Sequence, residues 1–405
     1  MASVSGHKRP LYSTSAPAPG ETSEKKVPRA RRVALVLKNF VQNNVVLCVA
    51  VVLAGLSALL IPPDSAYLGY FDFRTLTCLF CTLAVICALR GIRFFTILAR
   101  RIVMLTGNIR TAVLALVYIT FIGSMLIAND MALLTFLPLG ISVLRCSGKE
   151  KYMAFTFIMQ NIAANLGGML TPFGNPQNLY LYSFFEIPGG EFVRIMAAPF
   201  TLAVALITLC CLVFVRPESM TLTDEGEGTL PRGRTVFYLL LFAYSVFIVF
   251  RVVPYWTGLI LIPISLVFTD RRALARVDYG LLFTFVFFFV FAGNVSRVAP
   301  VREVLSALME KNTLVFSTLS CQFISNVPSA ILLSHFTENY RELLWGVNIG
   351  GTGTLIASLA SLITYRQYRA ADPTHTRRYV VLFSAFNFAF LAVLLAFCLL
   401  LRYFL

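Results

Sequence analysis

The sequence has too few charged residues to belong to a soluble protein. Only 13% of its 405 residues are charged, whereas 58% are hydrophobic, and an ordinary soluble protein is about 25% charged. So few charges cannot cover the surface of a chain of this size, which excludes a soluble fold. The composition predicts a polytopic membrane protein. The net charge of +15 then predicts basic loops on the cytoplasmic side, and no nucleic acid is expected as a partner.

Histidine is scarce, which excludes most intramembrane enzyme chemistry. His7, His335 and His375 lie far apart, and neither paired aspartates nor His and Glu at zinc spacing occur. A nucleotide-binding loop of the form Gly-x-x-x-x-Gly-Lys is also missing. The Cys78-x-x-Cys81 pair is interpreted as two small apolar residues in a helix. An intramembrane enzyme or a structural protein is therefore the remote alternative. We expect no enzyme activity, no cofactor and no resident metal.

The composition divides the chain into four segments. Residues 1–32 are rich in Ser, Pro, Ala and basic residues and predict a disordered cytoplasmic tail. Most uncharged runs lie in 33–215 and 235–405, and the roughly neutral residues 216–234 predict a cytoplasmic linker. The first long apolar run starts too late for a cleavable signal peptide, so the amino terminus is expected to stay in the cytoplasm.

Two apolar runs in the first half are too long for one membrane span. Residues 113–144 would form a helix of about 48 Å, against a hydrocarbon core of ~30 Å, and Asn129-Asp130 lies in its middle. Residues 153–185 hold two prolines and a glycine that stop a helix, so 174–178 are expected to be unwound. The pattern predicts a re-entrant hairpin followed by a broken helix. A tilted helix with a polar kink is the alternative for either segment.

Three features of the first half recur in the second half in the same order. An aspartate opens an apolar run, an asparagine lies in the middle of a run, and an Asn-x-Gly-Gly motif follows. The pairs are Asp72 with Asp278, Asn129 with Asn326, and Asn165 with Asn348. Internal duplication with interrupted hydrophobic segments at matching places points to the binding site of a secondary transporter.

The basic residues indicate how the two halves are oriented. With the tail inside, the basic clusters within 90–101, 145–151 and 366–378 also fall inside, provided that 111–144 and 312–334 are hairpins. The predicted fold class is therefore an all-α polytopic membrane protein with two inverted repeats, each with a re-entrant hairpin and a broken transmembrane helix. The first repeat is 33–215. The second, preceded by a linker helix, occupies 235–405, which places the carboxyl terminus outside.

The polar residues beside the helix breaks form the predicted substrate site. Helix ends there leave amide donors, which attract anions, and carbonyl acceptors, which coordinate sodium. Asparagine offers both a donor and an acceptor, whereas a glycine could serve only helix packing and a lone serine could bond only to its own helix. The predicted substrate-binding residues are Asn129, Asn165, Thr171, Gly174, Asn175, Asn178, Ser325, Asn326, Asn348, Thr354 and Ser358.

Asp130 is the predicted ion-coupling residue. A carboxylate inside the membrane is costly unless it is protonated or paired, so it is a functional hypothesis by default. The second half has Val327 at the matching position, which leaves one ionisable group. An ionised Asp130 would repel an anion and attract a proton or a sodium ion, the two expected coupling ions. The alternative is a structural cap at a hairpin tip nearer to water.

The motifs at these positions resemble those of the ion transporter superfamily. Residues 127–138, with Ile-Ala-Asn-Asp followed by Leu-Leu-Thr-Phe-Leu-Pro, are similar to the first hairpin of arsenite permeases. Residues 165–178 and 325–333 resemble the superfamily's broken helix and second hairpin. The superfamily includes citrate–metal symporters, NhaD-type sodium/proton antiporters and divalent anion/sodium symporters. The resemblance covers about residues 40–402.

The resemblance implies a substrate site between hairpin tips and broken helices, and alternating access, with an elevator movement in a homodimer as one form of it. Divalent anion/sodium symporters carry Ser-Asn-Thr at both tips, whereas this chain has Ala128-Asn-Asp and Ser325-Asn-Val. This departure favours an arsenite-permease-like or antiporter-like branch over dicarboxylate–sodium symport.

We therefore predict a secondary active transporter of a small arsenite-type, inorganic or carboxylate anion, coupled to a proton or sodium gradient. The alternative is a sodium/proton antiporter on the same scaffold. The expected location is the plasma or inner membrane, and the expected partners are the small ion, the lipid bilayer and a second copy of the chain.

Overall fold

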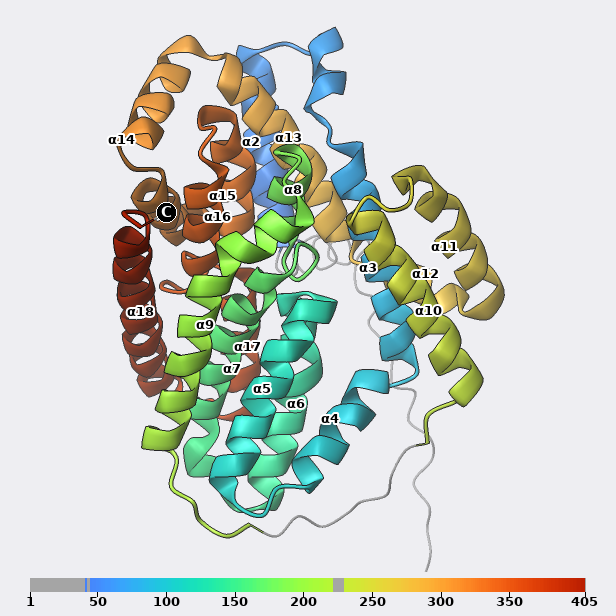
Figure 1. The fold of residues 1–405 in the computed structure, drawn as a ribbon, viewed down its shortest axis with the longest axis vertical. Coiled ribbons are helices and arrows are strands. Elements are labelled where there is room, and N and C mark those ends of the chain that lie inside the picture. Colours follow the sequence, from blue (N-terminus) through green and yellow to red (C-terminus); the bar gives the residue numbers. More distant parts are fainter. Residues whose placement is uncertain (1–40, 42–43, 221–228, 405) are drawn as a thin grey trace, which may run out of the picture. The chain divides into compact units, whose positions relative to one another are not determined.

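The computed structural model describes residues 41, 44–220 and 229–404, and these are almost entirely helical (Figure 1). Within these ranges the only β-structure is one isolated bridge between Asn108 and Ser219. The predicted tail at 1–32 lies outside the described residues, as do positions 221–228 of the predicted linker. The prediction of an all-α fold is confirmed.

The helices follow one another with short connections. In the first half they are α2 (Val45–Leu60), η1 (Ser65–Tyr70), α3 (Phe73–Gly91), α4 (Phe94–Met104), α5 (Ile109–Ile127), α6 (Asn129–Cys146), η2 (Glu150–Tyr152), α7 (Met153–Gly167), η3 (Gly168–Leu170), α8 (Pro176–Phe184) and α9 (Gly189–Phe214). In the second half they are α10 (Arg232–Val249), α11 (Tyr255–Thr269), α12 (Arg271–Ala275), α13 (Tyr279–Arg297), α14 (Ala299–Ile324), α15 (Asn326–Leu333), η4 (Ser334–Phe336), α16 (Tyr340–Ile349), α17 (Leu359–Ala371) and α18 (Thr376–Leu401).

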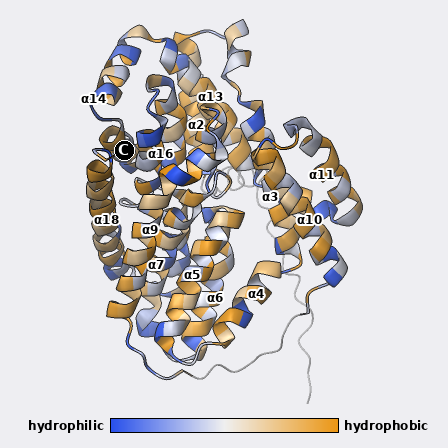
Figure 2. Ribbon diagram, in the orientation of Figure 1, coloured by the Kyte–Doolittle hydropathy of each residue, from blue (hydrophilic) through white to orange (hydrophobic). Residues whose placement is uncertain are grey.

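Seven helices in the described part of the chain are long and apolar enough to cross a membrane: α3, α5, α6, α9, α10, α13 and α18. Two further apolar helices, α2 and α11, are shorter. Large apolar side chains such as Leu212 on α9 and Phe268 on α11 are exposed. Figure 2 shows hydrophobic residues along most of the long helices and hydrophilic residues mainly near their ends. A helix satisfies its own backbone hydrogen bonds in lipid, so this chain is a multi-pass membrane protein.

The elements of the two halves correspond in order. Asp72 and Asp278 cap α3 and α13, each accepting a hydrogen bond of 2.9 Å from the backbone N–H three residues later. Asn108, before α5, and Asn312, inside α14, also accept a hydrogen bond of 3.0 Å from the backbone N–H three residues later. Asn312 has a non-helical φ of −165°, so it divides α14 where the first half has the separate helices α4 and α5. This correspondence supports the predicted duplication, while the inverted orientation of the halves stays a prediction.

The last helix of each half has 26 residues. The residues after it form ion pairs with the broken-helix region of the same half, and we call each set of ion pairs a charged clasp. After α9, Glu218 lies 2.6 Å from the Nζ atoms of both Lys149 and Lys151, which precede α7. After α18, Arg402 lies 4.0 Å from Glu342 in α16. The two clasps occupy matching places with opposite signs of charge.

Two helical segments were predicted only as charged connections. The basic cluster within 90–101 contains most of α4, and the charged residues before the predicted hairpin 312–334 contain the first part of α14. Their arginines and glutamates interrupt the apolar runs by which the other helices are recognised. A search for long uncharged runs therefore passes over such charged helices.

Candidate functional site

Two sharp turns join the helices of the hairpins. The turn between α5 and α6 is at Ala128 (φ 62°, ψ 151°), and the turn between α14 and α15 is at Ser325 (φ 73°, ψ 158°). Positive φ values are costly for residues other than glycine, so the surrounding structure must hold both turns. In each tip the next residue is an asparagine whose Oδ1 accepts a hydrogen bond from the following backbone N–H, at 2.9 Å for Asn129 and 3.0 Å for Asn326. The two tips therefore have the same backbone conformation and the same kind of asparagine hydrogen bond.

The broken helix of the first half consists of α7, η3 and α8. Its non-helical segment is 171–175, which forms a turn, and α8 begins at Pro176. The prediction that 174–178 are unwound is therefore wrong for the last three residues, because a proline fits the first turn of a helix. A Cβ atom on Gly174 would collide with the carbonyl oxygen of Gly168. Glycine at this position allows the two ends of the break to approach each other.

The broken helix of the second half consists of α16 and α17, separated by residues 350–358. The side chain of Gln322 holds this segment: its Nε2 donates to the Gly350 carbonyl at 2.9 Å, and its Oε1 accepts from the Thr354 amide at 2.9 Å. Ser358 caps α17 by accepting a hydrogen bond from the Ala360 amide at 3.1 Å. Gln322 was not among the predicted site residues, although an amide three residues before a predicted tip in an apolar run is a usable signal.

Each hairpin packs against the broken helix of the other half as well as its own. Helix α6 contacts α7 and also α17, and α15 contacts α16 and also α8. In Figure 1, α5 and α6 end below α8, so the first tip stops at the level of the first break. This crossed packing brings both tips and both breaks to one region, as expected for re-entrant hairpins.

Buried asparagines from both halves meet in this region. Asn129 Nδ2 donates to Asn165 Oδ1 at 3.4 Å. Asn175 Nδ2 donates to Asn348 Oδ1 at 3.3 Å, and Asn348 Nδ2 donates to Asn178 Oδ1 at 2.6 Å. Asn165 and Asn175 are linked through the Asn165 carbonyl, again at 3.4 Å. Amides from the first tip, the first break and the second broken helix therefore form one connected group.

The second tip joins this group at Gly351. A Cβ atom on Gly351 would lie 3.1 Å from Asn326 Nδ2 and 3.4 Å from Asn165 Oδ1. Both amides therefore point at the same glycine, one from each half of the chain. We call these six residues the asparagine cluster: Asn129, Asn165, Asn175, Asn178, Asn326 and Asn348. Each of them is at most 4% exposed.

The other predicted binding residues hold the backbone around the asparagine cluster. The hydroxyl of Thr171 donates to the Met125 carbonyl at 2.9 Å, and that of Thr354 donates to the Gln322 carbonyl at 3.0 Å. The hydroxyl of Ser325 lies 3.3 Å from the Ala357 carbonyl. With the cap made by Ser358, these hydroxyls brace the tips and breaks.

Asp130 follows Asn129 in the first turn of α6 and is partly buried. Its Oδ1 atom is buried and has no hydrogen-bond partner among the described residues. A buried carboxylate oxygen without a donor is costly, which suits a group that takes up a proton or a cation. Val327 at the second tip cannot do this. The ionisable group is therefore confined to one tip.

Further polar residues were not predicted but lie buried beside the asparagine cluster. Asn161 Nδ2 donates to Asn387 Oδ1 at 3.3 Å, and Thr364 Oγ1 lies 3.4 Å from Asn161 Oδ1, which links α7, α17 and α18. The Oε1 of Gln177, like the Oδ1 of Asn175 in the cluster itself, is buried without a partner in the described part of the chain. Asn161 lies one helical turn before Asn165, a spacing that could have identified it.

Within residues 41, 44–220 and 229–404, no group of three or more His, Cys, Asp or Glu side chains is placed to hold a metal ion. The asparagine cluster instead offers neutral donors and acceptors. Such groups can bind an anion through N–H donors or a sodium ion through carbonyl oxygens.

Comparison with known proteins shows two kinds of match. Residues 33–340 match the family described as citrate transporter. An uncharacterized transporter of Methanocaldococcus jannaschii is 32% identical over 296 residues, which cover 73% of this chain and 81% of that protein. The inner membrane protein YbiR of Escherichia coli is 29% identical over 282 residues, which cover 67% and 74% of the two chains.

Proposed function

Because the chain belongs to the citrate transporter family, we propose that it is a secondary active transporter of a small anion. Its transport is driven by a proton or sodium gradient through alternating access. Carboxylates of the citrate type are the first candidates, because the family carries that description, and arsenite and inorganic anions follow from the resemblance of the first tip. The amino terminus lies in the cytoplasm and the carboxyl terminus outside, in a plasma or inner membrane. The working unit is a homodimer.

The observation that carries this proposal is the asparagine cluster. Its six amides come from both tips and both broken helices, so a bound ion would contact every element that a change of access must move. Neutral amides bind a carboxylate or an oxyanion without the cost of burying a second full charge. In many transporters that work by alternating access, the substrate site lies between two structural repeats.

The alternative is a sodium/proton antiporter, and Asp130 favours it. One buried carboxylate oxygen without a partner suits the binding of a proton or a sodium ion in turn. In that case the asparagine cluster would supply oxygen ligands to sodium, and no anion would move.

Uptake into proteoliposomes separates the two functions. The panel contains citrate, succinate, phosphate, sulfate and arsenite, each with an imposed proton gradient, an imposed sodium gradient or neither. Gradient-dependent uptake of any anion supports the anion transporter. Sodium-driven movement of protons with no anion present, and no anion uptake under any gradient, would replace that proposal with the antiporter.

A further inference from the structure

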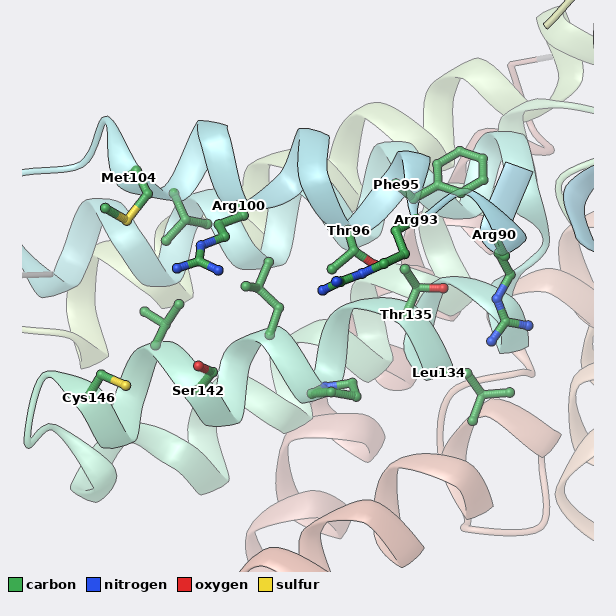
Figure 3. A pocket seen from close by; sticks show the side chains of 14 residues that line it. Arg90, Arg93, Phe95, Thr96, Arg100, Met104, Leu134, Thr135, Ser142 and Cys146 are labelled. Atoms are coloured by element: carbon green, nitrogen blue, oxygen red, sulfur yellow. The ribbon is translucent and has the colours of Figure 1, made fainter. Parts of the chain in front are cut away.

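A cavity of about 440 Å³ lies between α4 and α6, the second helix of the first hairpin (Figure 3). Three arginines line it: Arg90 in the last turn of α3, Arg93 in the turn between α3 and α4, and Arg100 in α4. Figure 3 shows the three guanidinium groups one after another along the length of α6. The cavity is within the size range of small-molecule sites.

The charged side chains that line this cavity are all positive. No Asp or Glu belongs to the described residues that line it, and the hydroxyls of Thr96, Thr135 and Ser142 add neutral hydrogen-bonding groups. Arginine is always protonated and holds planar oxyanions through paired N–H donors. Arg90 and Arg93 place two such charges in one cavity with apolar walls, which would raise the local concentration of anions.

The arginine-lined cavity extends toward the first hairpin tip. At one end it reaches Cys146, the last residue of α6, and at the other it reaches Leu134 and Arg90. The guanidinium of Arg90 contacts the Met131 sulfur at 2.8 Å. Met131 directly follows Asp130 in the sequence. Arg90, at this end of the cavity, therefore contacts the neighbour of the carboxylate that is expected to repel an approaching anion.

We propose that the arginine-lined cavity binds a small polyvalent oxyanion, a di- or tricarboxylate or a phosphate, before it reaches the asparagine cluster. This inference rests on the proposed anion transport and names a second site on its route. The guanidinium groups of Arg90 and Arg93 select polyvalent anions over monovalent ones. By the same chemistry the phosphate of an acidic lipid could occupy the cavity.

The test measures binding directly, without transport. Purified protein in nanodiscs of phosphatidylcholine is titrated with citrate, inorganic phosphate and chloride, and binding is followed by calorimetry. For Arg93→Gln and Arg90→Gln we expect the dissociation constant for citrate or phosphate to rise at least about tenfold, because a charge-assisted hydrogen bond is lost. Arg93→Lys should restore part of the affinity. Arg271→Gln is the matched control, since Arg271 is exposed and its Nε donates to the Val267 carbonyl in the preceding helix, α11. Each variant is used only if its thermal unfolding matches that of the wild type.

Two further arms separate the sources and the two proposals. Nanodiscs with added phosphatidylglycerol show whether the cavity takes a lipid headgroup. Stabilisation by that lipid alone, with no binding of citrate or phosphate, would overturn the proposed role in anion transport. Unchanged citrate and phosphate affinity in both arginine variants would also overturn it. In proteoliposomes, the Arg93→Gln variant could take up the anion at the same rate and with the same KM as the wild type. That result would overturn the inference about the cavity but not the proposed function. Arginine-dependent anion binding without any wild-type uptake defeats the proposed function but not the binding site.

Discussion

The two hairpin tips have the same backbone and different chemistry. Ala128 and Ser325 adopt nearly the same positive-φ conformation, and each is followed by an asparagine that caps the next turn. The next residue is Asp130 in the first tip and Val327 in the second. The asparagine that both tips share suits the binding of substrate from two sides. The carboxylate that only the first tip carries suits a coupling step that occurs on one side.

The tips also differ in how firmly they are tied to the breaks. At the second tip, the backbone N–H of Asn326 and the hydroxyl of Ser325 both donate to the Ala357 carbonyl, at 3.0 and 3.3 Å. At the first tip, Ala128 has no hydroxyl, and the Asn129 amide group reaches Asn165 only at 3.4 Å. We therefore expect the first tip, which also carries the carboxylate, to separate more easily from its broken helix.

The largest expected effect comes from removing the difference between the tips. Asp130→Asn should reduce gradient-driven uptake to the background of empty liposomes, because the one ionisable group of the site is lost. Folding and insertion should be preserved, since the amide has the same shape. The measurement is initial uptake with and without the gradient.

The matched control is Val327→Asn, which places the same amide in the other tip. It should leave most of the uptake and its dependence on the gradient in place. Wild-type coupling in Asp130→Asn, or an equal loss in both variants, would show that Asp130 is a structural cap.

The second prediction concerns what the tips share. Asn129→Ala and Asn326→Ala should each lower kcat/KM by roughly 10- to 100-fold. An unpaired buried partner costs about 1–3 kcal/mol, and about 1.4 kcal/mol corresponds to a factor of ten. The losses should be similar if both tips hold the substrate.

Asn294→Ala is the control for this pair. Asn294 is also buried, but it bonds to Ser57 and Tyr67, away from the tips. It should lower thermal stability without changing KM. A loss at one tip ten times larger than at the other would show that one tip carries the binding alone.

A third, smaller effect is expected from the strained turns. Ala128→Gly should raise the free energy of unfolding by about 1 kcal/mol, because glycine accepts positive φ values without strain. Ser325→Gly should give less, since it also loses the hydroxyl that reaches Ala357. Thermal unfolding in detergent measures both. A larger gain for Ser325→Gly would contradict the difference in tethering.

The smallest effect concerns the charged clasp of the first half. Its hydrogen bonds from Lys149, Lys151 and Tyr152 lower the pKa of Glu218 from 4.5 to about 2. A lowered pKa in the folded state means that the clasp contributes fully above about pH 4.5 and is lost as the pH falls toward 2.

Glu218→Gln should therefore lower the unfolding temperature slightly at pH 7, and the difference from the wild type should vanish as the pH falls through this range. Arg402→Gln removes the clasp of the second half and should leave this pH-dependent difference at Glu218 unchanged. A difference for Glu218→Gln that persists at pH 2 would contradict the assignment.

Much of this arrangement could be predicted from the sequence. The overlong runs showed where the chain must turn or break, because lipid limits the length of a straight helix. The turn falls at Ala128, one residue before the predicted Asn129-Asp130 pair. Six of the eleven predicted binding residues form the asparagine cluster, because an amide in an apolar run has to find partners.

The rest depends on contacts between segments far apart in the sequence. The bond between Asn175 and Asn348 spans 173 positions, and no local pattern indicates which amide meets which. Thr171 and Thr354, which were predicted to bind substrate, donate their hydroxyls to backbone carbonyls of α5 and α14, and the predicted Ser358 caps α17. The arginine-lined cavity was missed because Arg90, Arg93 and Arg100 were interpreted only as markers of the cytoplasmic side.

The composition of the asparagine cluster has one more consequence. An amide side chain has no titration in the physiological range, and a half-turn about its last bond exchanges its donor for its acceptor. The six amides could therefore reverse the direction of their hydrogen bonds without releasing or taking up a proton. Inward-facing and outward-facing forms could then be matched in energy, and the direction of net flux would be set by the gradients outside the protein.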